Sequence, residues 1–287
     1  MTAMNPLAAI FEDIKIQHTL FALPFAVMSA FIAARGWPGW RLFGLIIIAM
    51  FFVRSAAMAF NRLVDWRYDA ENPRTRGRAL PAGKATAAQY IIFVTLCSAG
   101  FLAACWHINT LAFYLSFPAL AIVFFYSFTK RFTAYSHFFL GLALALAPVG
   151  AWVAVREEVS QVALIIGVAV EFWLAGLDTI YSCQDYAFDT GRGLNSIPGK
   201  YGVAAALRMS AMFHTVMVVF LALAAWTASL SWIYMAGVAF TGAMLWYEHS
   251  LVRPDDLTRV NVAFFNVNGV ISVGLMLFAI ADVILLG

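Results

Sequence analysis

Charged residues are scarce in this sequence. Asp, Glu, Lys and Arg account for 11% of its 287 residues, whereas soluble globular domains carry about a quarter. Apolar residues account for 63% of the chain. So little charge excludes an ordinary soluble domain, and the composition predicts an integral membrane protein that lies in a lipid bilayer.

Cysteine is scarce as well. The three cysteines are Cys97, Cys105 and Cys183, none of them belongs to a Cys-x-x-Cys pair, and no histidine cluster lies beside them in the sequence. This pattern argues against both a zinc site and a disulfide framework. We interpret the cysteines as small residues packed within helices.

The sequence also leaves no room for a separate soluble domain. Apolar runs long enough to cross a bilayer recur along the chain, and the segments between them are mostly short. We predict one domain over residues 1–287, an all-α bundle of about nine transmembrane helices around a central cavity that opens to the cytoplasmic side. The expected helices lie near residues 19–35, 42–69, 88–106, 110–129, 135–155, 162–189, 207–228, 231–248 and 262–286.

The distribution of Lys and Arg predicts the orientation of the bundle. With the N-terminus inside, the outside loops contain only Arg35, Arg41 and Arg156, and Arg54 lies within a helix. The other 14 of the 18 basic residues (18 less these four) then lie inside, a bias typical of the cytoplasmic side. We expect a protein of the bacterial inner membrane with its active site facing the cytoplasm. The net charge of +3 reflects this bias, so we expect no nucleic-acid partner.

A polar segment, NRLVDWRYDAENPRTRGRALPAGK at residues 61–84, interrupts the apolar chain. Asn61, Asp65 and Asp69 follow one another at intervals of four residues, so they share one face of a helix. Two carboxylates about one turn apart can bind the same divalent cation. Arg54 lies on nearly the same stripe, and an arginine in a membrane helix normally has an anionic partner.

The same spacing returns near residue 180. Tyr181, Asp185 and Asp189 repeat the intervals of the first stripe, and Asp178 adds an acid on the same face. Each stripe is followed by a loop with basic residues and a proline. Clustered carboxylates repel one another unless cations neutralise them, and Mg²⁺ accepts a few carboxylates together with water and phosphate oxygens. The repeated pattern predicts a diphosphate held through Mg²⁺, with Arg and Lys sharing the remaining phosphate charge.

A third polar element, Tyr126-Ser-Phe-Thr-Lys130-Arg131-Phe-Thr133, follows the helix expected at 110–129. Taken alone, it is typical of a positively charged helix end anchored at the membrane interface. In a chain with two acidic stripes, however, Lys130 and Arg131 become candidates for contacts with phosphate.

Together these elements resemble the UbiA family of intramembrane aromatic prenyltransferases. The resemblance rests on the two aspartate stripes, on Tyr126-Ser-x-x-Lys130-Arg131 and on Arg-Ala-Leu-Pro-Ala-Gly at residues 78–83, and it covers nearly the whole chain. Among the subfamilies, the chain looks most like the 4-hydroxybenzoate polyprenyltransferases. The stretches at residues 15–24 and 185–198 also resemble a branch that serves the futalosine route to menaquinone.

The resemblance implies transfer of a polyprenyl group from its diphosphate to a small aromatic acid in ubiquinone or menaquinone biosynthesis. Metals and bases would stabilise the leaving diphosphate, and the apolar bundle would shield the allylic cation from water. The implied Mg²⁺ ligands are Asp65 and Asp69 on one side and Asp185 and Asp189 on the other. The implied phosphate contacts are Asn61, Arg74, Arg78, Lys130 and Arg131.

The acceptor is expected deeper in the bundle. Asp178 and Tyr181 lie one to two turns from the second metal pair, roughly 6–11 Å, which suits contact with the reacting carbon or the acceptor ring. Asp178 is a candidate proton acceptor or cation stabiliser, with a structural pair to Arg54 as the alternative. Arg54 suits the acceptor's carboxylate, because its guanidinium offers a planar bidentate fork.

The identity of the acceptor stays open at this stage. Lys15 is a further candidate for the acceptor's carboxylate, and it stands where many relatives carry an arginine. A lysine contacts a carboxylate as a point charge and lacks the fork of an arginine. Both 4-hydroxybenzoate and 1,4-dihydroxy-6-naphthoate fit this arrangement.

Two other functions are alternatives. Intramembrane acids also mark ion paths in transporters, but these acids lie at helix ends among bases, which suits phosphate chemistry better. A CDP-alcohol phosphotransferase would need an Asp-x-x-Asp-Gly-x-x-Ala-Arg type of run, which the sequence lacks.

Overall fold

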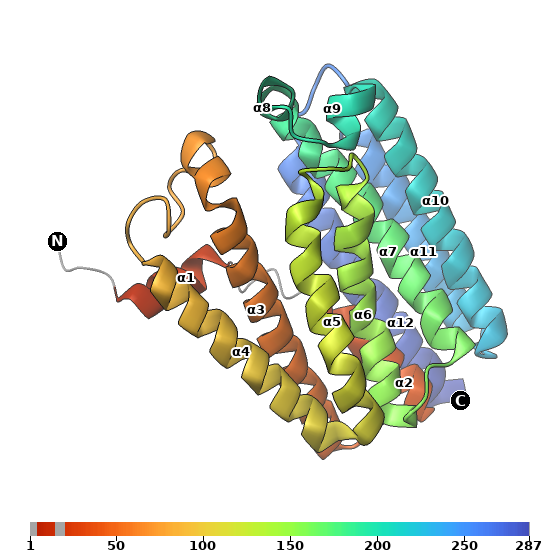
Figure 1. Cartoon of the computed structure of the whole chain (residues 1–287). Coiled ribbons are helices and arrows are strands. Elements are labelled where there is room, and N and C mark those ends of the chain that lie inside the picture. Colours follow the sequence, from red (N-terminus) through yellow and green to blue (C-terminus); the bar gives the residue numbers. More distant parts are fainter. Residues whose placement is uncertain (1–4, 15–20, 287) are drawn as a thin grey trace. The chain divides into compact units, whose positions relative to one another are not determined.

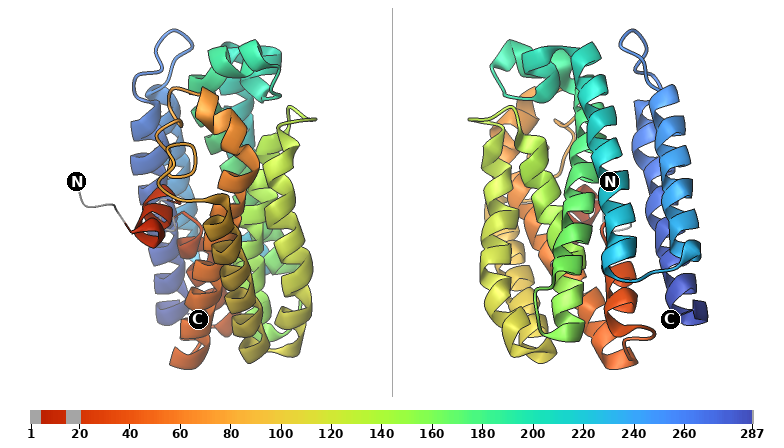
Figure 2. Two further views of the ribbon diagram at one scale, coloured as in Figure 1. Left: turned by 60° about the vertical axis from the view of Figure 1, so that its left-hand side comes forward. Right: turned by 90° about the vertical axis from the view of Figure 1, so that its right-hand side faces the viewer.

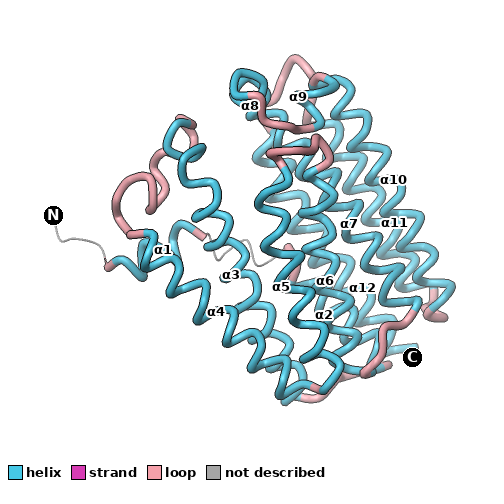
Figure 3. Tube along the Cα trace, viewed as in Figure 1, coloured by secondary structure: helices cyan, strands magenta, loops and turns pink. Residues whose placement is uncertain are grey.

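The computed structural model describes residues 5–14 and 21–286 (Figure 1). Over these residues the chain forms helices and loops, with no strand beyond one isolated bridge between Arg253 and Asp256 (Figure 3). The prediction of an all-α chain is therefore confirmed. The chain divides into two compact units, Met1–Thr19 with Leu45–Phe128 (unit 1) and Leu20–Gly44 with Thr129–Gly287 (unit 2), and each is described by itself. The single domain stays a prediction.

Unit 1 contains a short N-terminal helix that packs on longer ones. Its helices are α1 (Pro6–Asp13), most of α3 (Trp40–Glu71), α4 (Ala87–Ile108) and α5 (Thr110–Thr129). Ile10 from α1, Ala59 from α3 and Phe93 from α4 are buried in one apolar core. Helix α4 begins at a capping box, in which the Gln89 N–H donates to the Thr86 hydroxyl (3.3 Å) and the Thr86 N–H donates to the Gln89 side chain (2.9 Å).

Helix α3 is longer than a membrane span requires. Its 32 residues extend about 48 Å at 1.5 Å per residue, whereas a hydrocarbon core of about 30 Å needs about 20 residues. The first half of the helix is apolar, and Asn61, Asp65 and Asp69 lie in its last three turns. The acidic stripe is therefore carried on the polar end of an apolar helix.

Unit 2 is built around α7, which is the most deeply buried of its long helices. Its elements are α2 (Leu23–Ala34), α6 (Ser136–Arg156), α7 (Gln161–Ser182), η2 (Cys183–Asp185), α8 (Tyr186–Arg192), α9 (Ile197–Tyr201), α10 (Val203–Thr227), α11 (Trp232–Ser250), η3 (Val262–Val267) and α12 (Asn268–Leu286). Helices α6, α7, α10, α11 and α12 run along one another (Figures 1 and 2). The close contact of α6 with α7 requires Gly141, because a side chain there would meet the backbone carbonyl of Glu171.

Seven of the described helical segments are long and apolar enough to cross a membrane, so the chain is an integral membrane protein. These segments are Trp40–Glu71, Ala87–Ile108, Thr110–Thr129, Ser136–Arg156, Gln161–Arg192, Val203–Thr227 and Val262–Leu286. Helix α2 has only 12 residues, about 18 Å, and α11 is not among the seven. The nine spans and the side to which a cavity opens therefore stay predictions.

Candidate active site

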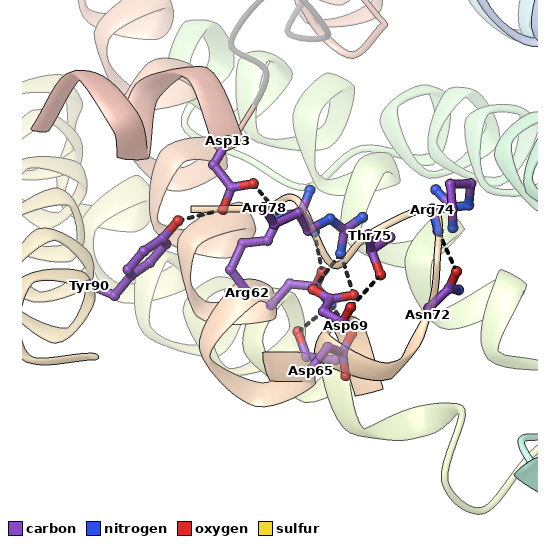
Figure 4. Close-up of polar contacts among 11 residues, drawn as sticks. Asp13, Arg62, Asp65, Asp69, Asn72, Arg74, Thr75, Arg78 and Tyr90 are labelled. Atoms are coloured by element: carbon purple, nitrogen blue, oxygen red, sulfur yellow. Dashed lines mark hydrogen bonds and ion pairs between the residues drawn. The ribbon is translucent and has the colours of Figure 1, made fainter. Parts of the chain in front are cut away.

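The end of α3 and the loop that follows it hold a cluster of acids and bases in unit 1 (Figure 4). The side chain of Asp69 is buried, and Nη1 of Arg78 donates to both of its carboxylate oxygens at 2.5 and 2.6 Å. The Thr75 hydroxyl donates to the backbone carbonyl of Asp69 at 3.1 Å and so fixes the loop to the helix end. Arg78, a predicted phosphate contact, thus lies directly on a predicted metal ligand.

The two other members of the first stripe also touch. The Asn61 side-chain NH₂ donates to Oδ2 of Asp65 at 2.9 Å, which confirms that residues four apart share a face of α3. The same NH₂ group is 3.5 Å from the Ser127 hydroxyl at the end of α5. The first stripe and the start of the third polar element therefore meet within unit 1.

Arg54 lies two turns before Asn61 on α3, half-buried in unit 1. It interacts electrostatically with Tyr126 of α5, and Tyr126 interacts in turn with Asp65. Arg54, the candidate for binding the acceptor's carboxylate, therefore lies close to the first stripe. Asp178, which was the alternative partner of Arg54, belongs to unit 2 and pairs with a histidine there, as described below.

Arg62 was missed as a site residue, because in the sequence it is only one of many bases at helix ends. The structure buries it: its residue is 6% exposed, Nη1 donates to Oδ1 of Asn61 at 3.0 Å, and Nε lies 3.8 Å from Oδ1 of Asp13. Oδ2 of Asp13 accepts a hydrogen bond from the Tyr90 hydroxyl at 2.5 Å. These contacts connect α1 and α4 to the acidic stripe of α3 (Figure 4).

The second stripe departs from the prediction. We expected Tyr181, Asp185 and Asp189 on one continuous helix, but α7 ends at Ser182 and a 3₁₀ turn separates it from α8. The Ser182 hydroxyl (2.9 Å) and the Cys183 thiol (3.4 Å) both donate to the carbonyl of Thr179. Side chains that bind a helix carbonyl in this way offer an alternative to the α-helical hydrogen bonds at the point where α7 ends.

Asp178 pairs with a histidine that the sequence did not single out. Oδ2 of Asp178 is 2.7 Å from Nδ1 of His137 in α6, and His137 is fully buried. The backbone N–H of Ile197 donates to Nε2 of His137 at 3.4 Å. Because Nε2 accepts, the ring proton is assigned to Nδ1, which donates to Asp178. The two residues are 41 positions apart, so only the packing of α6 on α7 reveals the pair.

The loop after α8 joins the second stripe to the Lys130 segment within unit 2. The N–H of Leu194 donates to the carbonyl of Asp189 at 2.9 Å, and the N–H of Asn195 donates to the carbonyl of Lys130 at 3.0 Å. The Asp189 side chain is buried, accepts a hydrogen bond from Ser196 and interacts electrostatically with Lys130 and Asp185. The structure therefore brings Asp189 near Asp185 and Lys130, and their roles as metal ligands and phosphate contact stay predictions.

The remaining predicted site residues are less informative. Arg131 is exposed beside Lys130, and Arg74 is exposed in the loop after α3, where its backbone N–H donates to the Asn72 side chain at 2.9 Å. Tyr181 is half-buried, and the centroid of its ring lies 4.3 Å from the centroid of the Phe264 ring. Lys15 lies outside the described residues.

The donor chemistry of these clusters fits Mg²⁺. Each unit supplies a pair of carboxylates with a base beside it, and carboxylate oxygens are ligands that Mg²⁺ prefers. Among the described residues no group of three or more His, Cys, Asp or Glu side chains is placed to hold a metal by itself.

These features place the protein in the class of all-α integral membrane proteins that have acids and bases clustered at the polar ends of apolar helices. The UbiA prenyltransferase family matches residues 22–270, so the chain belongs to this family and is a prenyltransferase. A relative from Marinobacter nauticus, named 4-hydroxybenzoate octaprenyltransferase, is 31% identical over 251 residues, which cover 87% of this chain and 85% of the relative. The transporter alternative is therefore not retained.

Two solved structures share the fold. The apo structure of a UbiA homolog from Aeropyrum pernix is 31% identical, with a TM-score of 0.84 over 93% of this chain and 98% of that one. A UbiA homolog from Archaeoglobus fulgidus bound to GPP and Mg²⁺ has a TM-score of 0.74 over 96% of this chain and 99% of that one. The second is only 20% identical, so it shows the common fold alone.

Proposed function

We propose that this protein transfers a polyprenyl group from a polyprenyl diphosphate to a small aromatic acid in quinone biosynthesis. The observation that carries the proposal is the cluster of Asn61, Asp65, Asp69 and Arg78 at the polar end of an apolar helix in a UbiA chain. The acceptor would be 4-hydroxybenzoate or 1,4-dihydroxy-6-naphthoate. The names of curated relatives support the first. The reaction would take place in the bacterial inner membrane, on its cytoplasmic side.

The acids would hold Mg²⁺, Asp65 and Asp69 in unit 1 and Asp185 and Asp189 in unit 2. Bound Mg²⁺ would neutralise the diphosphate and stabilise it as a leaving group. Arg78 is already paired with Asp69, so it would have to share or exchange this contact when the diphosphate arrives. Lys130, Arg131 and Arg74 are exposed bases that would take up further phosphate charge. The apolar helices would exclude water from the allylic cation.

The acceptor would be oriented by Arg54, whose guanidinium suits a carboxylate, with Lys15 as a further candidate. Asp178 would take the proton that the aromatic ring loses when it attacks the allylic carbon. This proton would pass from the ring carbon to a carboxylate oxygen of Asp178. His137 donates to Oδ2 of the same group and holds it in place.

The proposed function predicts a specific pattern of activity. The purified protein should transfer prenyl groups only with Mg²⁺ present, and Asp65→Asn or Asp185→Asn should reduce turnover to background because a carboxylate ligand is lost. Asp255→Asn, which changes an exposed acid outside both stripes, is the matched control and should retain full activity. Near-normal rates in both stripe variants would show that these acids only solvate helix ends.

The same assay identifies which aromatic acid is the acceptor. Equal concentrations of 4-hydroxybenzoate and 1,4-dihydroxy-6-naphthoate, mixed with one prenyl diphosphate, would compete for the site. The ratio of the two products gives the ratio of the kcat/KM values directly. A series of prenyl diphosphates would then define the chain length. If neither acid is prenylated by any of them, the proposed substrate class is wrong.

A further inference from the structure

We infer that Asp13 and Arg62 are positioning residues for the first acidic stripe. Asp13 holds Arg62, and Arg62 fixes the side-chain amide of Asn61 so that its NH₂ group faces Asp65. The inference rests on the proposed function, because it concerns the orientation of a proposed Mg²⁺ ligand. It gives the N-terminal helix α1 a role in metal binding, although α1 itself contributes no ligand.

The first step is the orientation of Asn61. A guanidinium has only donors, so the atom of Asn61 that faces Nη1 of Arg62 at 3.0 Å must be the amide oxygen. The amide NH₂ then points to the other side and donates to Oδ2 of Asp65 at 2.9 Å. Without Arg62 the amide could turn over, and its oxygen would then repel the carboxylate. Arg62 therefore reinforces the orientation of Asn61 that Asp65 itself also favours, and holds the amide in place from its other side.

The second step is the position of Arg62 itself. Its side chain is 7% exposed and that of Asp13 is 5% exposed, with Nε of the arginine 3.8 Å from Oδ1 of the acid. The other oxygen of Asp13 accepts from the hydroxyl of Tyr90, a fully buried residue of α4. Ile10 of α1 is buried in the same core, which fixes the helix that ends at Asp13. A chain of contacts thus runs from Tyr90 through Asp13 and Arg62 toward Asp65 (Figure 4).

The third step is energetic. Nε of Arg62 is buried without a hydrogen-bond partner, so the arginine is not fully satisfied by its surroundings. A buried ion pair often contributes no more stability than well-packed apolar residues of similar volume. Stability alone therefore does not account for a charged pair at this place. Its contact with Asn61, and through Asn61 with the proposed ligand Asp65, gives the pair a role beyond stability.

The test compares metal affinity with stability in the full-length protein, purified in lipid nanodiscs. The variants are Asp13→Asn, Arg62→Met and the double variant, and Glu12→Gln changes an exposed acid of the same helix as a matched control. Mn²⁺ replaces Mg²⁺ as the probe, and its free concentration is measured by electron paramagnetic resonance in the presence of an uncleavable prenyl thiodiphosphate. Thermal unfolding is followed in the same samples.

We expect Arg62→Met and the double variant to bind Mn²⁺ about 10- to 100-fold more weakly, as is typical when a group that orients a metal ligand is removed. The double variant should unfold near the wild-type temperature, because it contains no unpaired buried charge. Glu12→Gln should match the wild type in both measurements. A double variant with wild-type Mn²⁺ affinity would overturn the inference and leave only a structural ion pair. If the wild type itself bound no Mn²⁺ with the diphosphate analogue, the proposed function would fail, and this inference with it.

Discussion

Asp178 and His137 show how one side chain can hold a largely buried acid. His137 belongs to α6, and its ring contacts α7 and α9. Its Nδ1 donates to Asp178 of α7, and its Nε2 accepts from the backbone N–H of Ile197 in α9. The imidazole therefore fixes the carboxylate relative to the loop that follows the second stripe. A proton acceptor must be oriented as well as basic, so this pair matters for the proposed chemistry.

Two substitutions at His137 separate orientation from packing. Asn can place its NH₂ near the position of Nδ1, whereas Phe fills the space and leaves Asp178 without this donor. We expect His137→Phe to lower kcat by about 5- to 150-fold, which corresponds to the 1–3 kcal/mol for an unpaired polar group. His137→Asn should recover most of the loss. Steady-state kinetics at saturating diphosphate and acceptor measures both, with the exposed His107→Asn as control. Equal rates for the Phe and Asn variants would assign His137 a packing role only.

Residue contacts were predictable only over short sequence distances. The contact of Asn61 with Asp65 follows from their spacing of four, because such residues are neighbours on a helix. The contact of Asp69 with Arg78 depends on how the loop folds back, which no periodicity specifies. Arg62 is adjacent to Asn61 but its burial depends on α1, a helix that the apolar runs did not reveal.

At the scale of helices, the apolar runs located the elements well. The helix expected at 110–129 is α5 with the same ends, and the one expected at 42–69 is α3, which is longer by two residues at each end. The interruption after Ser182 was missed because the spacing of the acids does not show where an α-helix gives way to a 3₁₀ turn. The π-helical turn η3 was missed as well, since an apolar pattern does not distinguish it from an α-helix.

The two glycines of α6 offer a direct test of how this helix packs. A Cβ atom at Gly141 would meet the backbone carbonyl of Glu171, whereas one at Gly150 would meet nothing within 4 Å. We expect Gly141→Ala to destabilise the protein by about 1–3 kcal/mol, because backbone in a packed helix pair cannot easily move away. Gly150→Ala should be neutral or stabilising by up to about 1 kcal/mol through helix propensity.

The measurement is thermal or denaturant unfolding of both variants in the same detergent. A lower midpoint for Gly141→Ala, together with an unchanged or higher one for Gly150→Ala, would support the close contact of α6 and α7. If both variants unfolded at the wild-type midpoint, the two helices would be farther apart than described.

At the scale of the whole molecule, the charge distribution predicts how the protein is oriented in the membrane. The helices of unit 2 are sufficient to state this prediction. These antiparallel helices place the loops at 157–160 and 228–231 at one end, and α8, α9 and the loop at 251–261 at the other. The second end carries four basic residues, Arg192 at the end of α8, Lys200 in α9, and Arg253 and Arg259 in the loop at 251–261, whereas the first end has Arg156 beside its loop. The positive-inside rule therefore predicts that the second end faces the cytoplasm.

Helix α11 decides the count of spans in unit 2. It is 19 residues long, about 28 Å, which is close to the thickness of a hydrocarbon core. It packs along α10 and α12, and the buried side chain of Asn268 donates to Oε1 of Glu248 at 2.8 Å. A helix held in this way beside two membrane-spanning neighbours should cross the membrane with them, although its composition is less apolar.

Cysteine labelling tests both the orientation and the crossing of α11. Glu158→Cys, Ser229→Cys and Asp255→Cys place thiols at exposed loop positions, and the native cysteines are buried. In bacterial spheroplasts, a membrane-impermeant maleimide should label positions 158 and 229 directly, and position 255 only after the membrane is permeabilised. Labelling of 229 and 255 from the same side would show that α11 does not cross. Direct labelling of 255 with protection of 158 would reverse the predicted orientation and place this end of unit 2, with Asp185 and Asp189, outside the cytoplasm.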